Sequence, residues 1–440
     1  MEVIVSAAVL VIVIVGALAA IDSVTSTAGA NKARTVASAL AEKDQEQLRA
    51  LRTTELSTLK SLIPAPREVV VDRLKYTITS DAQWVTDAQG QNISCALTGG
   101  DGSFLRITST VTSKARGVRP VTLTSIVAPQ PGSGTLTVIV KNVAGTGVKN
   151  LGVEATGPAG VTTKSTDANG CAIFGAVDSG TYSIRLDQSG WMGTNCVQQA
   201  TKTVNVAAGS LTTAEMLYDQ EATGSVNVQT LIPPATTPVA DPSTGVTVAH
   251  TGLQTQFCTV PATAPATPAS TFGLELFPFK TPYKIFSGRC LGADPSKYGT
   301  TAVSTPALTP GGSAGTITVR EPATNLRVSR GGGTNWRSGA VIHAYPTGAD
   351  CDEEITLGPT LSTPSGSIGK VQFPGLPFGD YQVCADWKSG SSTWKTNTIP
   401  TLQNRAAGGA TTTTILDISN SSTANGACAD PTPPVPDDGS

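Results

Sequence analysis

The first twenty-two residues constrain this chain more than any other stretch. From Val3 to Ile21 the sequence carries no charged residue, and Glu2 and Asp22 stand at its two ends. At about 1.5 Å of rise per residue, a helix of this length matches the roughly 30 Å hydrocarbon core of a bilayer. We therefore predict an uncharged membrane helix over Val3–Ile21, followed by an exported chain.

The helical pattern continues beyond this apolar run until the first proline, Pro64. Between Thr35 and Ile63, apolar residues recur at three-, four- and eight-residue steps: Val36, Leu40, Leu48, Leu51, Leu56, Leu59 and Leu62. Such spacing is typical of an amphipathic helix that buries one face. We predict one long helix over 1–63, with a weak point at residues 23–31, where Gly29 costs about 1 kcal/mol relative to alanine.

Short segments with alternating apolar residues follow the helix. They cover 73–79, 83–86, 104–112 and 121–127. Alternation of this kind predicts an antiparallel sheet with one buried face, and the apolar stripe of the helix is available to cover it. The fold class expected is therefore an α+β head on one long N-terminal helix, with residues 64–128 forming the sheet. Residues 129–133 hold two prolines and a glycine and are predicted to be a linker.

Beyond the linker only β patterns remain, and they repeat. A similar first strand recurs about every 90 residues, at 134–140, 224–228 and 315–319. Each is followed by an apolar residue, a Gly or Pro turn and a tyrosine on a strand: Phe174, Val177, Gly180, Tyr182 and Ile184; Leu276, Phe279, Pro282, Tyr283 and Ile285; Phe373, Leu376, Gly379, Tyr381 and Val383. We predict three all-β sandwich modules in tandem, at 134–219, at 222–312 in divergent form, and at 315–419. The Pro- and Asp-rich tail over 420–440 is expected to be disordered.

Eight cysteines follow the membrane segment: Cys95, Cys171, Cys196, Cys258, Cys290, Cys351, Cys384 and Cys428. An even number in an exported chain, with no Cys-x-x-Cys pair, favours disulfides over a metal or redox motif. Eight cysteines allow about a hundred pairings, so connectivity rests on the module boundaries. We predict one bridge inside each module and, by elimination, a bridge between Cys95 and Cys428.

Composition and motifs argue against an enzyme or a nucleic-acid binder. Charged residues make up 14% of the chain, the net charge is −2, and no cluster of Lys and Arg offers a surface for nucleic acid. His250 and His343 are isolated and are expected to be structural or exposed. The acidic run Asp350–Glu354 is either a solvated loop or a calcium site. We predict no catalytic residue, no cofactor and no metal.

Exposed aromatic residues are the remaining candidates for binding. Trp387 and Trp394 flank a polar turn. Each tryptophan either caps a sandwich core or offers an aromatic face to a glycan or protein ligand.

The start of the chain, Met-Glu-Val-Ile-Val-Ser, followed by the apolar run and Asn31-Lys32-Ala33-Arg34, resembles the N-terminal helix of type IV pilins and pseudopilins, above all the minor pilins of high-G+C Gram-positive bacteria. The resemblance implies processing by a prepilin peptidase, export by a pilus assembly machinery and packing against other pilin subunits. It also implies that Glu2 pairs with the N-terminal amine of a neighbouring subunit. The printed sequence begins one residue before Glu2, so no cleavage site is named.

The repeated strand and tyrosine pattern, with Asp167-Ala-Asn-Gly170 in the first unit, resembles prealbumin-like modules of the Cna-B and carboxypeptidase-regulatory type. Some Cna-B modules hold a Lys–Asn isopeptide bond, and Lys141 stands where such a lysine would lie. No matching asparagine is evident, and the later strands have Gln229 and Arg320 instead of lysine, so disulfides are expected to do this work.

Taken together, these patterns predict a non-enzymatic, surface-exposed minor pilin-like subunit, located in the cell membrane before assembly and on the extracellular surface afterwards. A membrane-anchored adhesin or carbohydrate-binding protein is one alternative, and a secretion-system pseudopilin is another. The sequence does not distinguish among them.

Overall fold

The computed structural model describes residues 2–51, 66–86, 95, 103–114, 118–128, 131–232, 235, 237–265, 267–348, 350–351, 353–390, 392–396, 399–405, 413–418 and 428. In the first turns of the N-terminal helix, side chains are described for residue 7 and from residue 9 onward. The chain divides into two compact units. One comprises Met1–Lys141, Thr146–Leu186 and Thr201–Met216, and the other comprises Asn142–Gly145, Asp187–Ala200 and Leu217–Ser440.

The N-terminal helix is continuous. Helix α1 runs over Glu2–Arg49, through the segment predicted to be weak. There, hydroxyl groups donate to carbonyl oxygens one turn earlier: Thr25 Oγ1 to Ile21 O at 2.9 Å, and Thr27 Oγ1 to Ser23 O at 2.7 Å. These side chains therefore point back along the helix backbone instead of breaking it. The predicted weakness of residues 23–31 stays a prediction.

The helix ends earlier than the apolar spacing predicts. Its last turn tightens, because Leu51 N–H donates to Leu48 O, three residues back, at 3.1 Å. The predicted continuation over 52–63, which includes Leu56, Leu59 and Leu62, lies outside the described residues.

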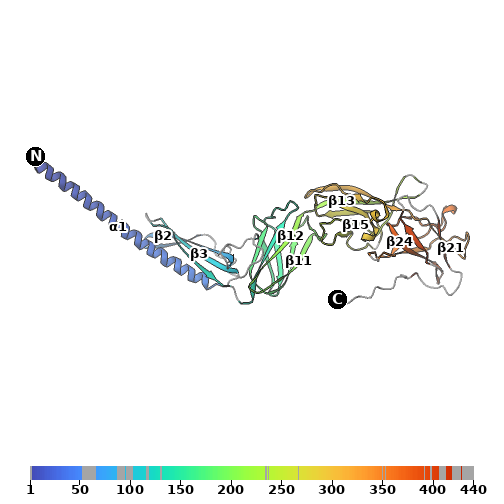
Figure 1. The fold of residues 1–440 in the computed structure, drawn as a ribbon, viewed down its shortest axis with the longest axis horizontal. Helices are drawn as coiled ribbons and strands as arrows, with labels where there is room; N and C mark the ends of the chain where they lie inside the picture. Colours follow the sequence, from blue (N-terminus) through green and yellow to red (C-terminus); the bar gives the residue numbers. More distant parts are fainter. Residues whose placement is uncertain are drawn as a thin grey trace. The chain divides into compact units, whose positions relative to one another are not determined.

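A four-stranded antiparallel sheet lies along the second half of α1 (Figure 1). Its strands, in order across the sheet, are β1 (Arg67–Val71), β2 (Leu74–Thr86), β3 (Ser103–Ser113) and β4 (Val121–Val127). The predicted segments 73–79 and 83–86 form one long strand, β2, and β1 was not predicted. The expected helix-on-sheet arrangement is therefore present.

The face of α1 that contacts the sheet differs from the predicted leucine stripe. Its buried residues are Ala33, Ala37, Ala41, Asp44, Gln45 and Leu48, whereas Val36 and Leu40 are only partly buried. Small alanine side chains let the helix approach the sheet closely, which a search for large apolar residues does not detect. Leu48 joins a second cluster with Trp84, Leu105 and Leu211.

Two sheets follow the linker. One has the order β10-β12-β5-β8 and the other the order β11-β9-β6-β7. The strands are β5 (Ser133–Lys141), β6 (Gly152–Gly157), β7 (Gly160–Ser165), β8 (Cys171–Asp178), β9 (Gly180–Asp187), β10 (Trp191–Gly193), β11 (Gln199–Val206) and β12 (Leu211–Gln220). The first strand, β5, thus lies beside the last, β12.

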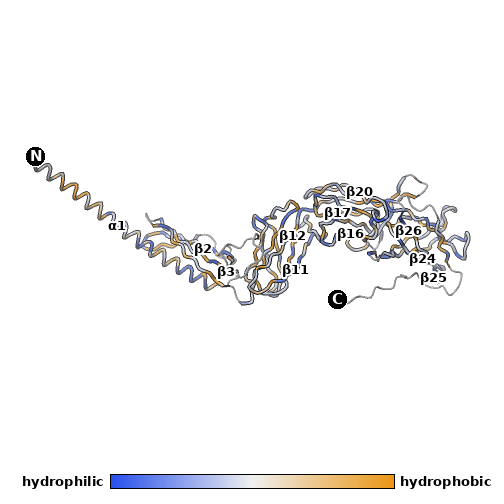
Figure 2. Tube along the Cα trace, in the orientation of Figure 1, coloured by the Kyte–Doolittle hydropathy of each residue, from blue (hydrophilic) through white to orange (hydrophobic). Residues whose placement is uncertain are grey.

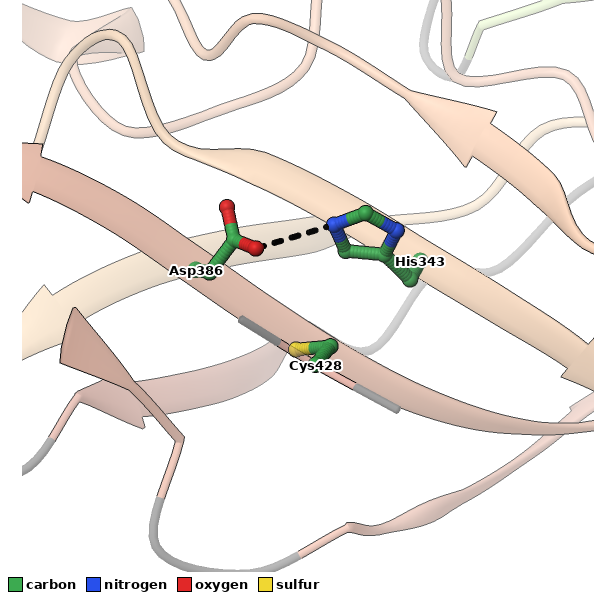
Figure 3. Close-up of side chains that lie close together, drawn as sticks. All are labelled: His343, Asp386 and Cys428. Atoms are coloured by element: carbon green, nitrogen blue, oxygen red, sulfur yellow. Dashed lines mark hydrogen bonds and ion pairs between the residues drawn. The ribbon is translucent and has the colours of Figure 1, made fainter. Parts of the chain in front are cut away.

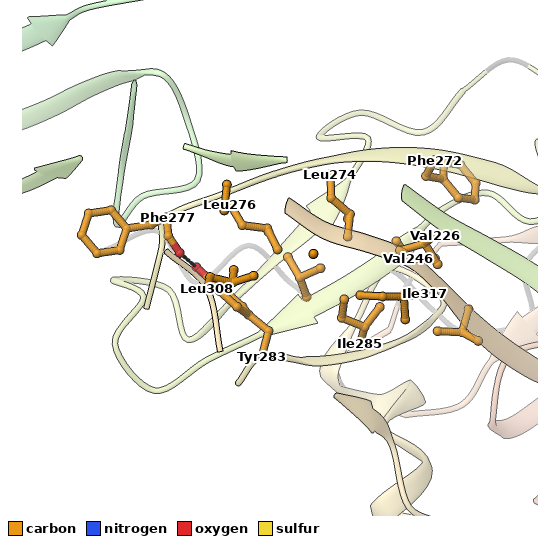
Figure 4. Close-up of a cluster of buried hydrophobic side chains, with 14 of the residues drawn as sticks. Val226, Val246, Phe272, Leu274, Leu276, Phe277, Tyr283, Ile285, Leu308 and Ile317 are labelled. Carbon is orange, nitrogen blue, oxygen red and sulfur yellow. Dashed lines mark hydrogen bonds between the residues drawn. The ribbon is translucent and has the colours of Figure 1, made fainter. Parts of the chain in front are cut away.

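The next two sheets enclose a large apolar core (Figure 4). One contains β13 (Ala222–Leu231), β14 (Val239–Ala240), β17 (Thr271–Leu276) and β20 (Ser313–Pro322). The other has the order β16-β15-β18-β19, from β15 (Val246–Ala249), β16 (Phe257–Val260), β18 (Lys284–Ser287) and β19 (Val303–Ser304). Short helices η1 (Leu291–Ala293) and η2 (Pro295–Tyr298) join β18 to β19.

The last part of the fold again consists of two sheets. Strand β21 (Leu326–Arg330) pairs in parallel with β27 (Thr414–Ile418). The other sheet contains β22 (Val341–Pro346), β23 (Ile355–Leu357), β24 (Gly379–Ser389), β25 (Ser392–Lys395) and β26 (Thr401–Asn404), with the short helix η3 (Ser365–Ser367) between β23 and β24.

One strand assignment from the sequence is wrong. Residues 315–319 were predicted to open the third module, but they lie in β20, which pairs in parallel with β13. Ile317 and Val319 are buried in the core that Figure 4 shows around β13. The error arose because β13 and β20 share the pattern of glycine followed by alternating β-branched residues. The module boundaries as such stay predictions.

The tyrosine of the repeated pattern has the same role three times. Tyr182, Tyr283 and Tyr381 are buried, and each hydroxyl donates to a backbone carbonyl upstream: Asp178 O at 2.9 Å, Phe277 O at 2.7 Å and Pro377 O at 3.0 Å. A buried phenol thus closes the turn that precedes its strand.

The disulfide pairing predicted from the sequence is wrong. All eight cysteines are bridged, but as Cys95–Cys171, Cys196–Cys258, Cys290–Cys351 and Cys384–Cys428. Cys171 and Cys196, for example, lie at opposite ends of the β8–β10 segment and each reaches outside it. The assumption that two cysteines within one module pair with each other therefore fails, because each bridge joins consecutive parts of the chain.

Candidate functional site

The first half of α1 consists mostly of hydrophobic residues (Figure 2). Large apolar side chains that are 48–71% exposed follow one another here: Val9, Leu10, Val11, Ile12, Val13, Ile14, Val15, Leu18, Ile21 and Val24. Among the described residues, one helix is long and apolar enough to cross a membrane, namely α1 from Val9 onward. Its most apolar stretch is not buried inside the protein. A helix that is hydrophobic all round requires an apolar environment, either lipid or other helices.

The second half of α1 is fixed to the sheet by a buried carboxylate. Asp44 is 2% exposed and accepts hydrogen bonds from Ser80 Oγ at 2.8 Å and Ser109 Oγ at 2.5 Å. It also forms an ion pair with Arg67 of β1. A buried charge is tolerated only when it is paired and hydrogen-bonded in this way. Asp44 thus connects the helix to three strands.

The adjacent Gln45 adds a second set of polar contacts. Its amide nitrogen donates to Ile107 O at 3.2 Å and Leu123 O at 3.0 Å, and its oxygen accepts from Ser125 Oγ. Further up the helix, Tyr76 Oη donates to Ala33 O at 3.4 Å. Sequence reasoning missed Asp44 and Gln45. They are in phase with Ala37, Ala41 and Leu48 on one helix face, which is the signal that could have revealed them.

The predicted assembly residue, Glu2, is the first residue of α1, and Val3 is the second. The side chains of both lie outside the described residues. Their predicted roles stay predictions.

The predicted binding residues Trp387 and Trp394 are cross-strand neighbours on β24 and β25. Both are partly buried against the core of the last sheets, and Trp387 Nε1 donates to Ser338 O at 3.1 Å. The Arg330 guanidinium carbon lies 4.3 Å from the Trp394 ring centroid, and that of Arg337 lies 4.9 Å from the Trp387 centroid. Arginines thus already stack on both rings, which fits the capping interpretation better than free faces for sugar.

His343, Asp386 and Cys428 lie close enough together for a metal site (Figure 3). His343 Nε2 is 3.2 Å from Asp386 Oδ2, and its Nδ1 contacts Glu354. Cys428, however, is bridged to Cys384, so its sulfur is not the thiolate that binds metal ions. The group is best described as an ion-paired histidine beside a disulfide.

The acidic run at 350–354 is likewise engaged in ion pairs. Asp350 lies 3.6 Å from Lys297, and Glu353 lies 2.7 Å from Arg289. Because cations of the chain already face these carboxylates, the arrangement favours the loop interpretation over a calcium site. Similarly, Lys141 Nζ lies 2.8 Å from Glu215, in an ion pair.

A buried pair of acids was not predicted from the sequence. Asp241 and Glu321 are 0% and 2% exposed, and Gly375 touches both, because a Cβ there would lie 2.3 Å from Asp241 Oδ2 and 2.7 Å from Glu321 Oε2. Burial, together with the nearby Asp241, raises the pKa of Glu321 to about 8. Burial also raises the pKa of Asp241 to about 6, although Gly375 N–H donates to it at 2.7 Å. Glu321 therefore keeps its proton at neutral pH.

Comparison with known proteins yields distant structural likenesses. No family model and no curated protein matches the chain. Among solved structures, the Bacillus anthracis TIE protein is 11% identical over 81% of this chain and 74% of its own, with a TM-score of 0.20. BcpA, the major pilin subunit of Bacillus cereus, is 13% identical over 66% and 99%, with a TM-score of 0.18. A streptococcal ancillary pilin is 11% identical over 60% and 96%, with a TM-score of 0.21. Scores this low establish neither a shared arrangement nor a shared function.

We predict that Asp44→Ala loosens the helix from its sheet. The change leaves Ser80, Ser109 and Arg67 without their acceptor, which should cost about 1–3 kcal/mol. Hydrogen–deuterium exchange of peptides from β2 and β3 should become faster. Glu46→Ala, at an exposed position of the same helix, should leave the exchange unchanged, and equal exchange in both variants would refute the role given to Asp44.

We also predict a pH dependence centred on Glu321. Because folded Glu321 keeps a proton that the unfolded carboxyl loses above about pH 4.5, the stability that this group contributes should be full below that pH and fall as the pH rises towards about 8. Glu321→Gln should flatten this decline and slow hydrogen exchange in β13 and β20 at pH 8. Glu275→Gln, at an exposed position on β17, should keep the wild-type slope. A Glu321→Gln variant with an unchanged pH slope would contradict the assignment.

Proposed function

We propose that this chain is a non-enzymatic minor subunit of a type IV pilus that displays β-sandwich modules on the cell surface for adhesion. One observation supports the proposal above all others: α1 is a single helix whose first half is apolar and exposed, while its second half is fixed to a sheet. A helix divided in this way can lie in a membrane before assembly and pack among other helices in a filament afterwards.

The β modules fit a display role better than a catalytic one. Both histidines have structural partners: His343 pairs with Glu354 and Asp386, and His250 stacks on Phe279 with ring centroids 3.9 Å apart. Burial lowers the pKa of His250, which disfavours its charged form. Both histidines, which were the candidates for catalysis in the sequence, are thus engaged in contacts with other side chains of the protein.

In the assembled state, Glu2 would pair with the N-terminal amine of an adjacent subunit, because a lone carboxylate in a dry helix bundle is costly. The alternatives use the same helix in other ways. A membrane-anchored adhesin would keep α1 in lipid, and a secretion-system pseudopilin would assemble it in a different filament.

Mechanical shearing of cells that express the protein tests the proposal. We expect the wild-type chain to leave the cells with sheared filaments, and Glu2→Ala to stay in the membrane fraction. Glu46→Ala should behave as wild type, because that residue is exposed on the half of α1 that the head occupies. A wild-type chain that stays in the membrane fraction after shearing would favour the anchored adhesin, and a Glu2→Ala variant that still assembles would refute the pairing of Glu2.

A further inference from the structure

The four disulfides form an uninterrupted series. Each joins one cysteine to the next in the sequence, and no bridge lies inside another. The bridged loops are long, with sequence separations of 76, 62, 61 and 44 residues. The segments between one bridge and the next are the shorter stretches 171–196, 258–290 and 351–384.

The bridged loops contain every connection between successive β units. Residues 128–132 join β4 to β5 inside the first loop, and Glu221 joins β12 to β13 inside the second. Residues 323–325 join β20 to β21 inside the third. Each of these three junctions is thus spanned by a disulfide.

The loops also contain the strands that close each unit. The adjacent first and last strands are β5 with β12, β13 with β20, and β21 with β27, and all six lie within bridged loops. Tension along the chain passes through a disulfide and avoids the longer backbone in parallel with it. The backbone of these strands therefore cannot be drawn out to full length while the bridges are intact.

Three of the eight cysteines lie in paired strands, and the other five lie in turns, bends or irregular backbone. Cys171 begins β8, and its N–H donates to Asp167 Oδ1 at 2.9 Å. Cys258 pairs with Val248 across β16 and β15, and Cys384 is 2% exposed in β24, where it pairs with His343. In three of the four bridges, force that enters through sulfur thus reaches a hydrogen-bonded sheet directly.

We propose that the protein is a tension-bearing tether in which each bridge bypasses one junction and limits how far the chain can extend. This inference rests on the proposed function only for the source of the load, which needs α1 held at one end. The bypass itself belongs to the chain and is testable on the purified protein.

Single-molecule force spectroscopy on the full-length chain, held in detergent by handles at its two ends, tests the bypass. At constant high force, adding a reducing agent should produce four steps, of about 260, 210, 210 and 150 Å, at roughly 3.5 Å per released residue. Bridges inside modules would instead release much shorter loops, of about 90 Å for Cys171–Cys196. Steps of that size, or no steps, would overturn the proposal.

Matched double variants give an independent check without reductant. Cys196→Ser with Cys258→Ser should lengthen the fully stretched chain by about 210 Å, and Cys384→Ser with Cys428→Ser by about 150 Å. Equal lengthening in both would contradict the serial arrangement. This outcome can be distinguished from that of the shearing experiment. A chain that shows these steps but stays in the membrane fraction is a membrane anchor with limited extension and not a pilus subunit. A chain that is sheared off with filaments but shows no steps is a filament subunit and not a tether.

Discussion

The carboxylate of Asp44 holds α1 against its sheet, and the position of the apolar half of the helix depends on this contact. It connects the helix to Arg67, Ser80 and Ser109 and thereby to three strands of one sheet. An apolar helix alone could slide or turn against that sheet, since alanines at Ala33, Ala37 and Ala41 offer little shape to fix its register. A buried, fully paired carboxylate tolerates few alternative positions, because displacement would leave it without partners. The exposed apolar half is therefore presented in one defined direction from the head.

The two halves of the protein use different means of holding their parts together. The helix and its sheet are joined by a polar contact and a shared apolar cluster that includes Leu48 and Leu105. The β units are each closed by pairing of first and last strands, and consecutive parts are joined by disulfides. Noncovalent contacts thus hold the helix against its sheet, and disulfides join consecutive parts of the chain, including the segment between β2 and β3 to β8.

Much of the fold could be read from residue patterns, and the failures have identifiable causes. Alternation predicted β3 and β4 closely, and the repeated tyrosines marked three equivalent turns. The helix face was misjudged because burial here depends on small residues and on two polar ones, which hydropathy ignores. Strand β20 was assigned to the wrong unit because sequence similarity to a first strand does not show which sheet the strand joins. The disulfide pairing failed because cysteine spacing contains no information about which side of a strand faces the neighbouring unit. The buried pair Asp241–Glu321 leaves no sequence signal, since its members are eighty residues apart.

The central claim is that the exposed half of α1 lies among helices of other subunits after export. A photo-crosslinking amino acid in place of Ile12, which is 71% exposed on the isolated chain, would test this most directly in cells. We expect crosslinks from this position to the apolar helix of another subunit in the sheared filament fraction. Crosslinks to lipid alone, with none to a second protein in any fraction, would contradict it.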